Sequence, residues 1–166
     1  MKPAVFFDRD GVINHDKGYV HEIKDLEWIL DAKETILYFN SKNYYVFVVT
    51  NQSGLARGFY SENDVRIFHS FMNSELKKIG ANIHEFFYSP FHPDFPLKKY
   101  SHLAHLRKPR TGMLELAMNK WNFDKEKSFL IGDKETDIQC AINFGIEGYL
   151  YKEGSLLQFV KAIEEE

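Results

Sequence analysis

Residues 6–14 read FFDRDGVIN, and they carry the most informative pattern in the chain. The apolar run from Ala4 ends in two aspartates one residue apart, Asp8 and Asp10, and Gly11 follows them. Such a run, closed by a turn residue, predicts a buried strand with two carboxylates at its C-terminal tip. In an open parallel sheet, ligands bind outside the carboxyl ends of the strands. Like charges repel and resist desolvation, so the pair indicates a divalent cation or proton transfer, with an ordinary Asp-Gly turn as the alternative.

The composition indicates one globular domain over residues 1–166. This length allows a sizeable single core, and 44% hydrophobic and 16% aromatic residues fit a packed interior. The net charge of −3 gives no sign of a general affinity for nucleic acid or anionic membrane. The one cysteine, Cys140, excludes an intrachain disulfide and fits a reducing cytosol. No segment has the apolar length of a signal peptide or a membrane span, so we expect a cytoplasmic protein.

Strand-like and helix-like patterns alternate along the chain. Near-continuous apolar runs, such as VFVV at 46–49, indicate strands buried on both faces. Strands that alternate with helices predict a parallel sheet with right-handed crossovers. The predicted strands are 4–8, 44–50, 85–89, 128–132 and 148–151, and the predicted helices are 32–41, 62–79, 112–121, 136–144 and 156–164. Residues 15–31 and 90–110 show no strong period and are predicted to be long loops, which in a compact domain are usually functional or disordered.

Four polar segments lie where the predicted strands end or a predicted helix begins. The first carries Asp8 and Asp10, and the others are 50–54 (TNQSG), 107–109 (RKP) and 131–137 (IGDKETD). Each segment alone has an ordinary explanation as a turn, a polar loop or a solvated charge. Together, in this order, they predict one catalytic site at the carboxyl edge of the sheet.

These motifs resemble those of the haloacid dehalogenase superfamily of phosphohydrolases. Over residues 4–148 the pattern is similar to its branch of D-glycero-D-manno-heptose-1,7-bisphosphate phosphatases and histidinol-phosphatases. The matching segments are 8–14 (DRDGVIN), 18–22 (GYVHE), 50–58 (TNQSGLARG) and 132–134 (GDK). The resemblance implies an α/β fold with a three-layer, Rossmann-like parallel sheet. No large insertion follows the first or second predicted strand, so we expect no large cap domain.

The resemblance also implies catalytic roles for four residues. Asp8 would attack phosphorus and form an aspartyl-phosphate. Asp10 would protonate the leaving alkoxide and then activate the water that hydrolyses the intermediate. The Thr50 hydroxyl and the Lys108 ammonium would hold the phosphoryl oxygens on which transition-state charge is spread.

A magnesium ion is the cofactor that the resemblance implies. Its ligands would be the Asp8 carboxylate, the main-chain carbonyl of Asp10, and Asp133, and such hard oxygen ligands suit Mg²⁺. Asp137 lies one helical turn beyond Asp133, and we expect it to support the site without binding the ion.

The substrate contacts of the family fall on residues in four segments. By resemblance they are Asp16, Lys17, Gly18, Tyr19, Asn51, Gln52, Ser53, Arg107 and Lys134. A bisphosphate needs a second anion site, and Arg107 is the best candidate because a guanidinium grips phosphate bidentately. Arg57 and Arg110 are weaker candidates, and surface solubility explains them equally well.

The loop at 90–110 departs from the family pattern. Many relatives carry structural zinc there on four ligands, but the corresponding positions here are Ser89, Phe91, Ala104 and Leu106. We therefore expect no structural zinc, although three histidines remain nearby: His92, His102 and His105. Apolar packing is predicted to replace the ion, from Phe91, Phe95, Leu97, Tyr100 and Leu106.

We therefore expect a monomeric Mg²⁺-dependent phosphatase that removes the 7-phosphate of heptose 1,7-bisphosphate. Its partner would be a small phosphorylated sugar, in the synthesis of nucleotide-activated heptose for lipopolysaccharide or capsule. A phosphatase for histidinol phosphate or another small phosphomonoester is the alternative. A non-catalytic phosphosugar-binding module is disfavoured because it needs no Asp10 beside Asp8. A nucleic-acid 3′-phosphatase is disfavoured by the negative charge and the lack of an extended basic stripe.

Overall fold

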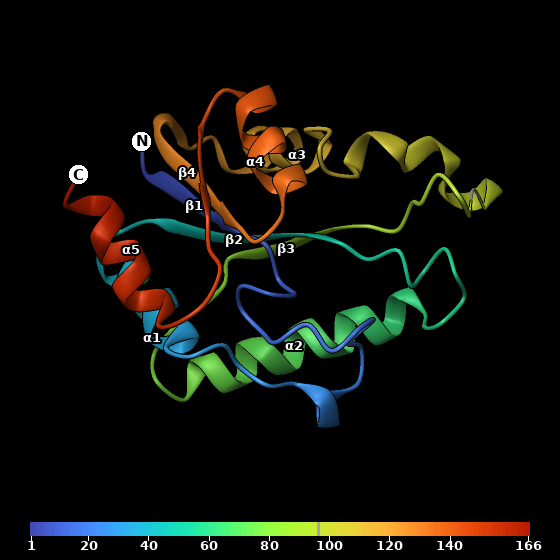
Figure 1. Cartoon of the computed structure of the whole chain (residues 1–166), viewed down its shortest axis with the longest axis horizontal. Coiled ribbons are helices and arrows are strands. Elements are labelled where there is room, and N and C mark those ends of the chain that lie inside the picture. The colour runs from blue at the N-terminus through green and yellow to red at the C-terminus, as the bar shows by residue number, and fades with distance from the viewer. Residues whose placement is uncertain (96) are drawn as a thin grey trace.

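The computed structural model describes residues 1–95 and 97–166 and contains a sheet of five parallel strands (Figure 1). The strands lie in the order β3-β2-β1-β4-β5, so β1 is central. Their bounds are Pro3–Phe7 for β1, Tyr45–Asn51 for β2, Glu85–Ser89 for β3, Asp124–Gly132 for β4 and Glu147–Leu150 for β5. The predicted parallel sheet is therefore confirmed, and the strand that leads into Asp8 lies at its centre.

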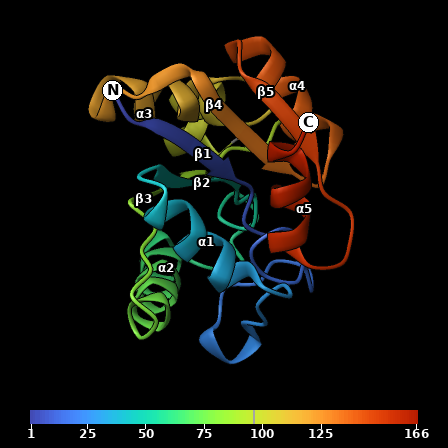
Figure 2. The ribbon, with the colours of Figure 1, turned by 90° about the vertical axis from the view of Figure 1, so that its left-hand side faces the viewer.

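Helices cover both faces of the sheet, which gives the predicted three layers (Figures 1 and 2). On one face pack α1 (Ala32–Ser41), α2 (Glu62–Lys77) and α5 (Leu156–Glu164), and on the other α3 (Gly112–Trp121) and α4 (Glu135–Phe144). The residues of β1 alternate between the two cores. Val5 and Phe7 join the first core, whereas Ala4 and Phe6 join the second, as the two-residue period of a strand requires.

The register of the sheet brings the chemistry-bearing segments to one edge. Phe7 pairs with Val48 of β2 on one side and with Ile131 of β4 on the other. The main-chain N–H of Asp8 extends this ladder by donating to Ile131 O at 3.0 Å. Because the strands are parallel, the segments after β1, β2 and β4 leave the sheet together.

The N-terminal part of β4 is the largest difference from the predicted elements. The strand begins at Asp124 rather than at residue 128, and most of the added residues are exposed. Main-chain contacts hold this part, because Asp124 pairs with Pro3 and its N–H donates to Lys2 O at 2.8 Å. These added residues are charged (DKEK) and are held through their main chain. They therefore show no apolar pattern from which a strand could be predicted. The other predicted elements agree to within two residues at each end.

The prediction of an irregular loop over 90–110 is wrong for Lys98–Leu106, which form a 3-10 helix, η2. Residue 96 of this loop lies outside the described residues. Tyr100 and Leu106 of η2 are buried, and Leu103 between them packs against the core. This spacing of three matches a 3-10 helix, which has three residues per turn, and a search for the α-helical period misses it. The other predicted loop contains a short 3-10 helix, η1 (Ile23–Asp25).

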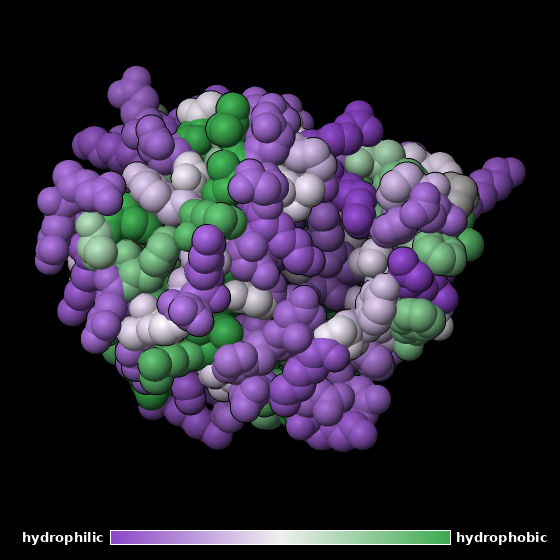
Figure 3. Space-filling model, viewed as in Figure 1, coloured by the Kyte–Doolittle hydropathy of each residue, from purple (hydrophilic) through white to green (hydrophobic). Residues whose placement is uncertain are grey.

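No cap domain follows β1 or β2 in the described part of the chain. Turns and η1 fill the connection from β1 to α1, and turns alone connect β2 to α2. The predicted absence of a large cap is thereby confirmed. None of the described helices is long and apolar enough to cross a membrane. The face seen in Figure 3 is mostly hydrophilic, with apolar residues in small separate groups.

Candidate active site

The polar segments at the carboxyl edge surround one pocket of about 300 Å³. Asp8 and Asp10 line it from the end of β1, and Asn51 and Ser53 from the end of β2. Lys108 reaches it from the segment between η2 and α3. The other lining residues are Asp16, Gly18, Tyr19, Tyr60, Lys134, Thr136 and Asp137. The structure therefore brings together the four segments that the sequence singles out.

The Lys108 ammonium is the centre of a buried ion-pair network. Its side chain is 3% exposed, and Nζ donates to Asp8 Oδ1 at 3.0 Å, Asp137 Oδ1 at 2.6 Å and Val49 O at 2.8 Å. Asn51 ties the main chain of Lys108 to β2, because Asn51 Oδ1 accepts from Lys108 N at 3.0 Å. An ammonium has three N–H donors, and all three have partners here. Lys108 is therefore held rigidly beside Asp8.

Burial and neighbouring charges oppose each other at this ion pair. Burial raises the pKa of the Asp8 carboxyl well above its ordinary value, the Lys108 ammonium opposes that shift, and Asp137 adds to it. Burial disfavours the charged form of Lys108, but Asp8 and Asp137 outweigh it and raise the Lys108 pKa. The lysine therefore stays charged, and the site carries more acids than one ammonium balances.

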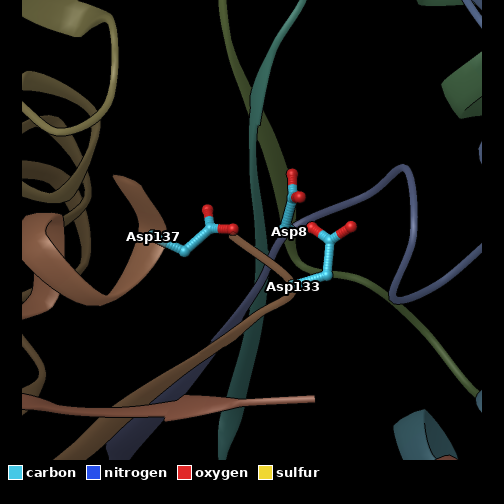
Figure 4. Close-up of side chains that lie close together, drawn as sticks. All are labelled: Asp8, Asp133 and Asp137. Carbon is cyan, nitrogen blue, oxygen red and sulfur yellow. The ribbon is translucent and has the colours of Figure 1, made fainter. Parts of the chain in front are cut away.

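Three carboxylates lie close together at the carboxyl edge of the sheet (Figure 4), and Asp8 and Asp137 line the pocket whereas Asp133 lines a neighbouring hollow with Gly11. Oxygens of Asp8, Asp133 and Asp137 lie within 4.8 Å of one another. Asp133 Oδ1 is buried and has no hydrogen-bond partner among the described residues. A Cβ at Gly11 would lie 2.1 Å from Asp133 Oδ2, so the glycine lets the Asp133 carboxylate approach the loop after β1. An orphaned carboxylate oxygen beside further acids fits the ligand set of a divalent cation.

The Asp10 carboxylate is held from both sides. Its Oδ1 accepts from Arg9 Nη2 at 2.9 Å and from Asn14 Nδ2 at 3.0 Å. Its Oδ2 accepts from Gln52 Nε2 at 3.0 Å, and Tyr60 fixes that amide by donating to Gln52 Oε1 at 2.5 Å. Asp10 thus meets the pocket in one defined orientation, as an acid or base needs.

Comparison with known proteins identifies the family of this chain. The HAD-hydrolase-like family model matches residues 105–158. The D-glycero-beta-D-manno-heptose-1,7-bisphosphate 7-phosphatase of Rhodopseudomonas palustris is 40% identical over 98% of this chain and 90% of its own length. The corresponding alpha-heptose enzyme of Campylobacter jejuni is 36% identical over 98% of this chain and 92% of its own.

The chain belongs to the haloacid dehalogenase superfamily. It is a phosphoric monoester hydrolase, and its relatives lie in the heptose bisphosphate branch. Among solved structures, the D,D-heptose 1,7-bisphosphate phosphatase of B. bronchiseptica, complexed with magnesium and phosphate, superposes with a TM-score of 0.81 at 26% identity. That match covers 98% of this chain and 87% of the other.

Not all of the substrate-contact residues expected in this haloacid dehalogenase phosphatase line the pocket. Asp16, Gly18, Tyr19, Asn51, Ser53 and Lys134 do. Lys17 lies at the surface with Nζ 3.9 Å from Glu27, and Gln52 is buried beneath Asp10. Thr50 is also buried, and its Oγ1 accepts from Gln52 Nε2 at 2.8 Å. The structure therefore separates residues that face the pocket from residues that support it.

Arg107 lies at the rim of the site rather than in the pocket wall. It is half-buried, and its Nη1 donates to Phe91 O at 3.3 Å. Burial lowers the Arg107 pKa, Asp94 opposes this, and nearby Arg57 adds to it. The Arg57 guanidinium lies 4.2 Å from the ring centre of Phe95 and 5.5 Å from that of Tyr19. The rim therefore carries two arginines near each other.

The loop that lacks the zinc ligands is held in part by apolar packing. Phe91 and Tyr100 pack in a small cluster with Leu55 and Tyr60, and Leu106 packs in the core under α3 and α4. The predicted packing of Phe95 and Leu97 is wrong, because they are 39% and 41% exposed. Within the described ranges, the group of acids, histidines and cysteines close enough to share a metal is Asp8, Asp133 and Asp137.

Four residues of the site were missed by sequence reasoning. Tyr60 and Thr136 line the pocket, and Arg9 and His69 lie behind Asp10. His69 had a detectable signal, because it shares the apolar face of α2 with these buried residues: Val65, Phe68, Met72 and Leu76. A histidine at that spacing on a buried face calls for a polar partner inside the protein.

Proposed function

We propose that this phosphatase hydrolyses the 7-phosphate of D-glycero-D-manno-heptose 1,7-bisphosphate through an aspartyl-phosphate on Asp8. One observation carries the chemistry: the buried Lys108 ammonium lies between Asp8 and Asp137 at the base of the pocket. The names of the relatives from R. palustris and C. jejuni support the substrate and differ in its anomer.

The reaction has two steps that return the enzyme to its starting state. In the first, an oxygen of Asp8 attacks phosphorus, the bond from phosphorus to the sugar oxygen breaks, and Asp10 gives that oxygen its proton. In the second, water attacks phosphorus while Asp10 takes a proton from it, and the bond to Asp8 breaks. The products are the sugar alcohol and inorganic phosphate. Lys108, which lines the pocket, faces the charge on the phosphoryl oxygens, and the buried Thr50 hydroxyl would reach them only by turning from Gln52.

The donor set beside the pocket fits Mg²⁺. We assign Asp8, Asp133 and the main-chain oxygen of Asp10 as ligands of the ion. We assign Asp137 the separate role of holding the Lys108 ammonium. The orphaned Asp133 Oδ1 and the excess of acids over ammonium support this assignment. When bound, the ion masks the repulsion between the nucleophile and the phosphate. EDTA is expected to abolish phosphate release and Mg²⁺ to restore it, and activity unaffected by chelation would contradict the assignment.

The pocket wall offers polar side chains for a sugar. Asp16, Ser53 and Lys134 can exchange hydrogen bonds with hydroxyl groups, and Tyr19 offers a ring face at the mouth. The second phosphate would reach the rim, where Arg107 and Arg57 supply positive charge. This arrangement favours a bisphosphate over a monophosphate, because only a bisphosphate uses both ends of the site.

Phosphate release in the presence of Mg²⁺ tests the substrate. Both anomers of the heptose bisphosphate are compared with histidinol phosphate and fructose 1,6-bisphosphate. We expect a kcat/KM for one heptose anomer in the range of about 10⁴–10⁸ M⁻¹s⁻¹, with the others far below. A histidinol phosphate rate equal to the best heptose rate would contradict the proposed substrate and leave the phosphatase chemistry intact.

A further inference from the structure

Arg9 lies between the two catalytic aspartates in sequence, yet its side chain points away from the pocket into the protein. It is 1% exposed, and its guanidinium lies 4.5 Å from the ring centre of Phe68. Nη2 donates to Asp10 Oδ1 at 2.9 Å and to Val20 O at 2.6 Å, and Nε approaches the same Asp10 oxygen at 3.3 Å. A buried charge needs partners of this kind on every side.

These contacts make the two oxygens of Asp10 unequal. Oδ1 accepts from two nitrogens of Arg9 and from Asn14, so its lone pairs are occupied. Among the residues that the structure describes, Gln52 alone donates to Oδ2. A proton on the Asp10 carboxyl therefore sits on Oδ2, and transfer to or from the substrate runs through that oxygen. The orientation of Arg9 decides which oxygen is available.

His69 supplies the remaining partner of Arg9. It comes from α2, which runs beside the loop after β1 (Figure 1), and its Nε2 lies 3.1 Å from Arg9 Nη1. A guanidinium only donates, so Nε2 must accept and the ring proton lies on Nδ1. Burial, and then the charge of Arg9, hold the His69 pKa well below its ordinary value, which keeps the ring neutral. Phe86 stacks on the ring at 4.2 Å and an interplanar angle of 11°, which fixes its plane.

We propose that His69 is a positioning residue for the hydrolysis: through Arg9 it holds the Asp10 carboxylate with Oδ2 available to the substrate. Without an acceptor at position 69, Nη1 is a buried donor that must turn to find one, and Asp10 Oδ1 moves with the guanidinium. The inference rests on the proposed acid and base role of Asp10. According to this inference, a residue of α2 that does not line the pocket, His69, influences the rate of hydrolysis.

The test compares an alkyl phosphate with an aryl phosphate. An alkoxide is a poor leaving group and needs the proton of Asp10, whereas p-nitrophenolate leaves without it. The alkyl substrate is the heptose bisphosphate, or glucose 6-phosphate if the heptose is not hydrolysed. For His69→Leu we expect kcat/KM to fall about 10-fold or more with the alkyl phosphate and less than about 3-fold with p-nitrophenyl phosphate.

Two further variants separate positioning from loss of stability. His69→Gln keeps an acceptor near Arg9 and is expected to recover most of the alkyl phosphate rate. Met72→Ala cuts a fully buried side chain from the same helix face and is expected to lower the melting temperature without changing the ratio of the two rates. Equal losses with both substrates in His69→Leu, no recovery in His69→Gln, or the same selective loss in Met72→Ala would each overturn the inference.

The Asp10→Asn variant distinguishes failure of the proposed mechanism from failure of the inference about His69. If the acid role holds, kcat/KM of this variant falls far more with the alkyl phosphate than with the aryl phosphate. The comparison uses kcat/KM because it covers the steps up to loss of the alcohol, whereas the later attack of water also needs Asp10 and is common to both substrates. If Asp10→Asn shows that selectivity and His69→Leu does not, the inference about His69 fails and the proposed mechanism stands. If Asp10→Asn shows no selectivity, the acid role of Asp10 fails, and the inference about His69 fails with it.

Discussion

The inner end of the pocket and its rim differ in what holds their side chains. At the inner end, Asp8, Lys108 and Asp137 are buried and joined by hydrogen bonds. They come from the tip of β1, the segment between η2 and α3, and the first turn of α4. At the rim, Tyr19 and Phe95 are exposed loop residues that contact Arg57 through ring faces. The sheet thus fixes the position of the reacting groups, whereas the loops are free to change what is recognised.

This difference follows from what each region must do. Phosphoryl transfer needs charges placed in advance, and buried charges are held in place because each must keep its partners. Recognition of a sugar needs contacts that tolerate substitution, and exposed residues meet that need at little cost in stability. Variants at the inner end are therefore expected to change kcat, and variants at the rim are expected to change KM.

Asp8→Asn is expected to have the largest effect. It removes the nucleophile and leaves the shape of the site, so kcat is expected to fall by at least about 10⁴-fold. The fold is expected to persist, because the neutral amide relieves repulsion with Asp137 and Asp133. Circular dichroism and a phosphate release assay check both statements. Hydrolysis at the wild-type rate would exclude Asp8 as the nucleophile.

Asp137→Ala tests whether Lys108 needs its second anchor. The variant removes the 2.6 Å contact to Lys108 Nζ and the acceptor for Lys134 N at 3.2 Å. We expect a fall in kcat of about 10²-fold, because a displaced ammonium no longer matches the transferring phosphoryl group. Asp137→Asn, which keeps the shape of the side chain and one of the two acceptor oxygens, is expected to lose less. A change confined to KM would place Asp137 with the rim residues instead.

Arg107→Ala tests the rim. Loss of a charged partner for the second phosphate is expected to raise the KM of the heptose bisphosphate about 10-fold and to leave kcat and the KM of a monophosphate nearly unchanged. Arg110→Ala is the matched control, because this exposed arginine lies three residues away. Equal effects of both variants on KM would indicate a general field of positive charge rather than a specific contact.

The same contrast explains how much could be predicted from the sequence. The strand leading to Asp8 and the chemistry at its tip were predictable, because burial on both faces leaves a run of apolar residues that polar residues end. The burial of Arg9 was not predictable. A charged residue between two aspartates is expected to be solvated, and only the fold shows that its side chain turns inward. The 3-10 helix η2 was missed because its period is three. The burial of Phe95 was predicted wrongly, because whether an aromatic residue on a loop is buried depends on how the neighbouring loops fold around it, and its own sequence segment does not show that.

The smallest expected effect is on stability, and it concerns the pH at which His69 is protonated. Its pKa in the folded protein lies well below the ordinary value of 6.5, to which it returns on unfolding. The unfolded chain therefore binds the proton more readily, so His69 favours folding fully above about pH 6.5 and loses that contribution as the pH falls toward the folded pKa. Urea unfolding from pH 7.5 to pH 5 is expected to show a smaller loss of stability in His69→Gln than in the wild type. Identical pH profiles would mean that His69 is not buried as a neutral acceptor, and the buried support behind Asp10 would then have to be assigned to Arg9 and Asn14 alone.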